Sequence, residues 1–178
     1  MRIVGGLYRH REIVFPDDLG TRPTKDRIRE SIFSALGMNI VDKRCVDLFA
    51  GSGAYGLEAI SRGAKVCDFI DLSNEAIKCI RENVKNLNIN SAHIYKEDYK
   101  DFLINHINKE DIDVIFIDPP YKMKVNDELV NYLISNKILS NNAIIVLETD
   151  EQLSFSQEQY SKVKYYKYGF IHVTIIWR

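Results

Sequence analysis

The stretch Asp47-Leu48-Phe49-Ala50-Gly51-Ser52-Gly53-Ala54-Tyr55-Gly56 decides the fold of this chain. It follows a short apolar run and opens a helical pattern, which is where a glycine-rich loop joins a strand to a helix in a doubly wound α/β domain. Glycine lets backbone amides approach a ligand closely, because it has no side chain to block the approach. We therefore expect a ligand to bind at this loop.

On both sides of the loop, short apolar runs rich in branched residues alternate with helical patterns, as in βαβ units with a parallel sheet. Strands are predicted at residues 44–49, 66–71, 92–95, 113–118 and 143–148. Helices are predicted at residues 55–62, 74–87, 99–107 and 126–136, with Ser73 or Asn74 and Asn126 as caps. Residues 162–168 and 170–177, separated by Gly169, are predicted to form a hairpin. The sequence thus predicts an α/β fold with a seven-stranded sheet, parallel except for one strand.

The N-terminal part has a different pattern. A hairpin of residues 2–4 and 12–15 is predicted, then a loop through Pro16 and Pro23, then a helix at residues 25–36. This part is too small for an independent core, so we expect it to pack onto the main domain. The predicted division is an extension of residues 1–38 and a Rossmann-like domain of residues 39–178.

Composition is that of a soluble globular protein. The 178 residues fit one domain, with 46% apolar and 28% charged residues. No apolar run is long enough to span a bilayer, and the N-terminus does not resemble a signal peptide, so a cytoplasmic protein without membrane contact is expected. Cys45, Cys67 and Cys79 are too far apart for a zinc site and are interpreted as small buried hydrophobes. No metal is expected.

Charge is unevenly distributed. The formal net charge of −1 excludes a uniformly basic surface for nucleic acid. Residues 1–29, however, contain seven lysines and arginines and four acidic residues, and Tyr8 and His10 lie among the basic ones. Such a cluster suits contacts with phosphates, but a solvated face explains it equally well.

A second strand-end carboxylate makes the glycine loop ambiguous. Asp71 lies about 20 residues beyond Gly51, where a carboxylate accepts hydrogen bonds from ribose hydroxyls in a doubly wound fold. The pattern Gly51-x-Gly53-x-x-Gly56 with Asp71 therefore also satisfies the dinucleotide fingerprint. An NAD site and S-adenosylmethionine site are both consistent with it.

Two further acids favour S-adenosylmethionine. Asp47 precedes the loop and is placed to accept from an ammonium group, and Asp98 follows the third strand and is placed to accept from an adenine amine. Three carboxylates around one pocket would repel the negative charges of a pyrophosphate and attract the positive sulfonium and ammonium groups. The candidate cofactor residues are Asp47, Phe49, Gly51, Ser52, Gly53, Asp71, Leu72, Asp98 and Tyr99.

Asp118-Pro119-Pro120-Tyr121 ends the fourth predicted strand and supplies the candidate catalytic residues. The two prolines hold the segment extended, and the ends of parallel strands meet at the ligand crevice. An exocyclic ring amine is a poor nucleophile because its lone pair is delocalised. The Asp118 carboxylate and Pro119 carbonyl can accept its two hydrogens and direct the lone pair at a methyl group, while Tyr121 offers a stacking face. A proline-rich turn with a surface tyrosine is the plain alternative.

Over nearly its whole length the sequence resembles the bacterial 16S ribosomal RNA guanine-N2 methyltransferases of the RsmD type. The matching blocks are Arg2-Ile3-Val4-Gly5-Gly6, Thr21-Arg22-Pro23-Thr24-Lys25-Asp26-Arg27-Ile28-Arg29-Glu30-Ser31-Ile32-Phe33, the glycine loop through Ala59, and Asp118-Pro119-Pro120-Tyr121. Many amino-methyltransferases share the last two blocks, whereas the Arg-Pro-Thr block selects this family.

The resemblance implies a class I methyltransferase fold, S-adenosylmethionine as donor, and the N2 amine of a guanine in small-subunit rRNA as acceptor. It also implies that the extension places RNA or closes over the cofactor, with Arg9, Arg11, Arg22, Thr24 and Arg27 as RNA-binding residues. The chain departs from the family at Asp71, where relatives often have glutamate, and at His10, where they often have glycine. The expected partner is small-subunit rRNA or the assembling subunit, bound by a monomer.

Other functions remain open at this point. Adenine, cytosine or a glutamine side chain are alternative acceptors, although glutamine-modifying relatives usually carry asparagine where Asp118 stands. A module that binds rRNA without catalysis and an NAD-dependent oxidoreductase are alternatives from other classes.

Overall fold

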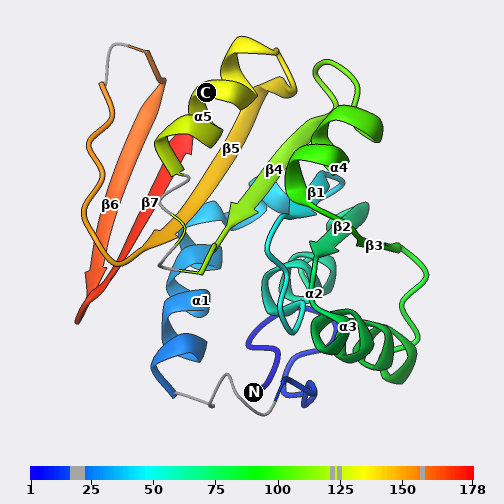
Figure 1. Cartoon of the computed structure of the whole chain (residues 1–178). Helices are drawn as coiled ribbons and strands as arrows, with labels where there is room; N and C mark the ends of the chain where they lie inside the picture. Colours follow the sequence, from blue (N-terminus) through cyan, green and yellow to red (C-terminus); the bar gives the residue numbers. More distant parts are fainter. Residues whose placement is uncertain (17–22, 121–122, 124–125, 157–158) are drawn as a thin grey trace.

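A computed structural model describes residues 1–16, 23–120, 123, 126–156 and 159–178 of the chain. Within these residues the chain forms one seven-stranded sheet of order β3-β2-β1-β4-β5-β7-β6, which Figure 1 shows from β6 at one edge to β3 at the other. The strands are β1 Arg44–Asp47, β2 Val66–Asp71, β3 Ala92–Lys96, β4 Ile112–Ile117, β5 Leu139–Thr149, β6 Lys162–Tyr168 and β7 Ile171–Trp177.

The strand directions confirm the predicted sheet. β1 to β5 pair in parallel, and β7 lies antiparallel between β5 and β6. The chain runs outward from β1 to β3 and then returns to place β4 on the other side of β1. This reversal is the topological switch point at which ligands bind in open α/β sheets.

Helices cover both faces of the sheet. In the described part of the chain they are α1 Pro23–Leu36, the short 3₁₀ helix η2 Gly37–Ile40, α2 Ala54–Ser61, α3 Asn74–Asn86, α4 Tyr99–Asn105 and α5 Asn126–Ser135. Side chains of α1, α2 and α3, among them Phe33, Leu57 and Ile80, join one apolar cluster. Those of α4 and α5, among them Phe102 and Val130, join the cluster on the opposite face. None of the helices in the described ranges is long and apolar enough to cross a bilayer.

Two loop-to-helix junctions are fixed by local caps. Ser73 Oγ accepts from the Ala76 amide at 3.3 Å, as predicted for the start of α3. Asp98 Oδ1 accepts from the Lys100 amide at 2.8 Å and starts α4. Asn126, expected as a cap, is the first residue of α5. Ser73 and Asp98 both follow a strand, so the caps hold the β2–α3 and β3–α4 loops at the carboxyl end of the sheet.

The N-terminal segment pairs with itself only briefly. The predicted hairpin is present as a short antiparallel pairing around the Arg2–Glu12 bridge, with a backbone hydrogen bond of 3.0 Å on either side of it and His10 at a φ of 69° in the turn. The segment is also bound to α2, since the Val4 amide donates to Glu58 Oε2 at 2.8 Å and the Leu7 amide to the Ser61 carbonyl at 2.7 Å. It therefore shares the core of the sheet domain, beside α1 and α2 (Figure 1).

Gly56 lets α2 pack directly on the sheet. A Cβ at this position would lie 2.3 Å from Phe69 Cε1 and 2.7 Å from Cys67 Sγ, which is closer than atoms can pack. Phe69 and Cys67 are fully buried on β2. Glycine is therefore required here for space, although it is a poor residue inside a helix.

We expect Gly56→Ala to lower the free energy of unfolding by about 2–3 kcal/mol, because overpacking a core outweighs the gain in helix propensity. Urea denaturation measures the change. Gly37→Asn is the control, since nothing lies within 4 Å of a Cβ there and asparagine tolerates its φ of 55°; we expect it to stay within about 0.5 kcal/mol of the parent. A stabilised Gly56→Ala protein would contradict the described packing.

Candidate active site

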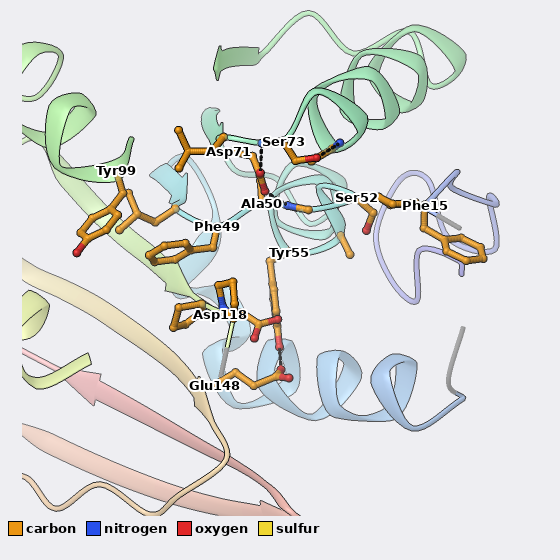
Figure 2. Close-up of a pocket in the computed structure, with 18 of the residues that line it drawn as sticks. Phe15, Phe49, Ala50, Ser52, Tyr55, Asp71, Ser73, Tyr99, Asp118 and Glu148 are labelled. Atoms are coloured by element: carbon orange, nitrogen blue, oxygen red, sulfur yellow. Dashed lines mark hydrogen bonds between the residues drawn. The ribbon is translucent and has the colours of Figure 1, made fainter. Parts of the chain in front are cut away.

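A cavity of about 500 Å³ opens at the carboxyl end of the sheet, at the switch point between β1 and β4. Its walls come from the loops after β1, β2, β3 and β4, from the end of β5, and from α1 and the N-terminal segment (Figure 2). Of the residues predicted for the cofactor and the chemistry, the cavity is lined by Phe49, Gly51, Ser52, Asp71, Leu72, Asp98, Tyr99, Asp118, Pro119 and Pro120. Segments that are far apart in the sequence thus meet in one pocket.

Asp71 links the glycine loop to the end of β2. Its Oδ2 accepts from the Gly51 amide at 2.8 Å, and its Oδ1 accepts from the Ser73 amide at 2.8 Å. Gly51 takes a φ of 54°, a left-handed conformation that favours glycine. Each carboxylate oxygen keeps a further acceptor site, because an ionised carboxylate accepts about four hydrogen bonds.

Asp47 lies beneath the loop. It is 2% exposed and its Oδ2 accepts from the Gly56 amide at 2.9 Å. Burial raises the pKa of Asp47 to about 7, opposed by the Gly56 hydrogen bond and assisted by the charge of Asp71. Gly53, at a φ of 80°, forms the N-terminal cap of α2. Neither Asp47 nor Gly53 is among the described residues that line the cavity. They support the conformation of the loop through the Gly56 hydrogen bond and the start of α2.

The opposite wall is apolar and aromatic. The rings of Phe49 and Tyr99 lie 5.1 Å apart between centroids (Figure 2). Both line the cavity, as do Leu72 and Asp98. Leu72 is 62% exposed, so its side chain is available to a ligand. A flat heterocycle fits this wall, with the Asp98 carboxylate beside it.

Asp118 and Pro119 follow β4 and enter the same cavity. Burial raises the pKa of Asp118 well above its ordinary value, the neighbouring Glu148 carboxylate raises it further, and Lys25 opposes the shift. Tyr121, predicted as the stacking residue, lies outside the described residues.

Tyr55 and Glu148 were not predicted as site residues. The Tyr55 hydroxyl donates to Glu148 Oε2 at 2.6 Å, and its ring stacks on Phe116 at 5.3 Å (Figure 2). Glu148 stands at the carboxyl end of β5. The strand-end argument used for Asp118 applies equally to Glu148, so the sequence carried a signal for it.

Three of the predicted RNA-binding residues, Arg9, Arg11 and Arg27, can be placed in the described part of the chain, and none of them lines the cavity. Arg9 and Arg27 are exposed, and Arg11 Nη2 donates to the Asn86 carbonyl at 3.2 Å. Arg22 and the side chain of Thr24 lie outside the described parts of the structure. Among the described residues, the cations that line the cavity are Lys25 and Arg29, both on α1.

The guanidinium group of Arg29 forms ion pairs with two carboxylates of the protein. It is 3% exposed, with Nη2 at 3.0 Å from Asp26 Oδ1 and Nε at 3.5 Å from Glu58 Oε2. Six acids also line the cavity in the part of the chain that the structure describes: Asp71, Glu75, Glu97, Asp98, Asp118 and Glu148. Among these described residues acids outnumber cations, which suits a cationic ligand such as S-adenosylmethionine and opposes a pyrophosphate.

The fold, with its pocket at the carboxyl ends of the parallel strands, is that of a class I methyltransferase. The family model described as "Conserved hypothetical protein 95" matches residues 1–177. The chain belongs to this family, which is that of the ribosomal RNA small subunit methyltransferases D.

Individual relatives agree with this assignment. The chain is 37% identical to Ribosomal RNA small subunit methyltransferase D of Escherichia coli (strain K12) over 150 residues, which cover 84% of this chain and 75% of that protein. The corresponding Haemophilus influenzae protein is 35% identical over 153 residues, or 85% of this chain and 79% of its own length. The solved structure of Escherichia coli yhhF superposes with a TM-score of 0.87 at 31% identity, covering 100% of this chain and 97% of that one.

Proposed function

We propose that this protein transfers the methyl group of S-adenosylmethionine to the exocyclic N2 amine of a guanine in small-subunit (16S) ribosomal RNA. The observation that carries the proposal is that Asp118 and Pro119 share one cavity with the glycine loop and Asp71. The substrate class is supported by the relatives, which are named as small-subunit rRNA methyltransferases. The N2 position rests on the chemistry of the site and on the family resemblance.

The cavity residues suit the parts of S-adenosylmethionine. Asp71 would accept from the ribose hydroxyls, Asp98 from the adenine amine, and Phe49, Leu72 and Tyr99 would pack against the adenine ring. The backbone around Gly51, Ser52 and Gly53 would hold the amino-acid end. Asp47 lies below this loop, where its charge favours an ammonium group. When bound, the cofactor supplies an electrophilic methyl group on sulfur.

The residues after β4 would activate the acceptor amine. The Asp118 carboxylate and the Pro119 carbonyl each accept one N2 hydrogen, which directs the nitrogen lone pair at the methyl carbon. Pro120 keeps this segment extended, and Tyr121 would stack on the base. Methylation would make this nitrogen acidic, and Asp118 would accept the proton that the nitrogen loses. The raised pKa of Asp118 suits it to take this proton.

We propose that residues 1–38 form an extension that closes over the cofactor and places the RNA, next to the catalytic domain of residues 39–178. Met1, Phe15 and Pro16 line the cavity, which supports a covering role. Arg9, Arg11, Arg22, Thr24 and Arg27 would contact RNA phosphates. The protein would act as a monomer in the cytoplasm, on free small-subunit rRNA or on the assembling subunit.

The test is to map methylated nucleosides in small-subunit rRNA by mass spectrometry from cells with and without the gene. We expect one N2-methylguanosine to disappear in the deletion strain and to return with the wild-type gene but not with Asp118→Ala. An unchanged set of methylated nucleosides would refute the proposal. A missing methyladenosine or methylcytidine would assign the activity to the alternative acceptors.

Lys25 gives a prediction about pH dependence. Its charge lowers the pKa of Asp118, so Lys25→Met should raise that pKa further. Because the active form of Asp118 is the carboxylate, the acid limb of kcat/KM for S-adenosylmethionine should move to higher pH. Lys25→Arg keeps the charge and should leave the limb in place. A shift to lower pH in Lys25→Met would contradict the role of Asp118 as the titrating group.

A further inference from the structure

Glu148 is a buried carboxylate that the proposed chemistry does not use. It is 4% exposed and lines the cavity at the end of β5. Its Oε2 accepts from the Tyr55 hydroxyl, but its Oε1 has no hydrogen-bond partner among the described residues. Leaving a buried charged acceptor unpaired is costly, so Oε1 is suited to a donor that a ligand brings.

The sheet places Glu148 beside Asp118. Ile117 of β4 pairs with Leu147 of β5, so the next residue of each strand stands at neighbouring positions on the same edge. Adjacent strands lie about 4.8 Å apart, a spacing that lets two carboxylates meet one planar base. Their proximity is also evident in the electrostatics, because the charge of Glu148 raises the pKa of Asp118.

Tyr55 fixes the orientation of Glu148. Its hydroxyl lies 2.6 Å from Oε2, and its ring is stacked on Phe116 of β4 at an interplanar angle of 14°. A packed aromatic donor of this kind holds the carboxylate in one rotamer. Oε1 is then the oxygen left for a ligand.

We propose that Glu148 Oε1 accepts a hydrogen bond from the ring N1–H of the target guanine, and so determines which base is methylated. The inference rests on the proposed function and concerns the same site. In guanine an N–H group stands next to the exocyclic amine, whereas in adenine and cytosine a bare ring nitrogen stands there. A carboxylate can only accept hydrogen bonds, so it pairs with the guanine edge and repels the lone pair of the other two. With N2 at Asp118 and N1–H at Glu148, the site selects guanine.

The experiment uses an RNA fragment that carries the mapped target guanine, and the same fragment with 2-aminopurine at that position. 2-Aminopurine keeps the exocyclic amine but has no hydrogen on N1. The measured quantity is the ratio of kcat/KM for guanine to kcat/KM for 2-aminopurine, in wild type and in Glu148→Gln. Comparing the two ratios cancels the intrinsic reactivity of each base.

We expect Glu148→Gln to lower this ratio by about 10- to 100-fold, as for the loss of one hydrogen bond to a charged group. The glutamine amide can donate to a bare ring nitrogen, so part of the change should appear as a gain on 2-aminopurine. Glu75→Gln makes the same chemical change at another carboxylate of the cavity wall and should leave the ratio unchanged. An unchanged ratio in Glu148→Gln would overturn the inference, since a merely structural Glu148 lowers both rates together.

Two further measurements keep the test decisive. If a thermal melt shows that Glu148→Gln does not fold, Glu148→Asp is used in its place. This variant retains the carboxylate and should still prefer the guanine RNA over the 2-aminopurine RNA. Equal rates on the two RNAs, with wild type or with Glu148→Asp, would overturn the inference. Failure of the proposed function has a different signature, because wild type would then form no N2-methylguanosine in the guanine RNA.

Discussion

Asp118→Ala is expected to lower kcat by at least about a thousandfold, while the affinity for S-adenosylmethionine changes by less than about threefold. The substitution removes both an acceptor for the N2 hydrogen and the group that takes the proton, and losses of these kinds are each typically 10²-fold or more. Asp118 lies after β4, whereas Asp71, the proposed ribose contact, is the last residue of β2. Single-turnover kinetics measures the first quantity and calorimetry the second.

Asp118→Asn is the informative companion variant. Its amide oxygen can still accept one amine hydrogen, but the side chain cannot take up a proton. We therefore expect a rate between wild type and Asp118→Ala. Full activity in Asp118→Ala with intact cofactor binding would remove Asp118 from the chemistry altogether.

Asp71→Ala is expected to weaken S-adenosylmethionine binding by about a hundredfold or more. The Asp71 carboxylate orders the loop through the Gly51 and Ser73 amides, and it is the proposed partner of the ribose hydroxyls. Losing charge-assisted hydrogen bonds costs about 1.5–3 kcal/mol each, so a hundredfold loss requires no more than two of them. Calorimetric titration measures the affinity.

Two controls accompany Asp71→Ala. Asp101→Ala removes an exposed carboxylate from α4 and should leave the affinity unchanged. Asp71→Glu keeps the carboxylate on a side chain that is one methylene longer and should keep most of the binding. Wild-type affinity in Asp71→Ala would show that the cofactor is held elsewhere.

The predicted sheet agrees with the structure because its central strands, such as β4 and β7, are buried and strongly apolar. Differences arise where pairing overrides local pattern. The sequence predicts that β5 begins at residue 143, but it begins at Leu139, which pairs with Ile112. The register shifts after this pair, and the polar residues 140–142 that follow Leu139 do not have the apolar pattern by which a buried strand is predicted. At the N-terminus, the amides of Val4 and Leu7 donate to α2, so the predicted hairpin stays limited to a short pairing around Arg2 and Glu12. Such long-range partners are invisible to a local periodicity.

Much of the pocket could be predicted from motifs, since each motif ends a strand and parallel strands end together. Glu148 was missed because only its position near the end of a strand marks it, whereas Asp118 also belongs to a sequence motif. Asp47 shows a different limit. Its position before the loop suggested a direct ligand contact, whereas the backbone turns so tightly that its carboxylate caps the Gly56 amide beneath the loop. Side-chain direction at a loop depends on backbone dihedral angles, which spacing alone does not specify.

The two ends of the described chain lie at opposite ends of the parallel strands. Met1 lines the cavity and its Sδ lies 3.9 Å from Ser52 Oγ, while Arg178 donates its amide to the Ala143 carbonyl where the parallel run of β5 begins. An affinity tag joined in front of Met1 would therefore emerge at the mouth of the substrate pocket and compete with RNA for space. A tag joined after Arg178 would emerge at the amino ends of the parallel strands, which makes that end the better attachment point for purification, fluorophores or surface immobilisation.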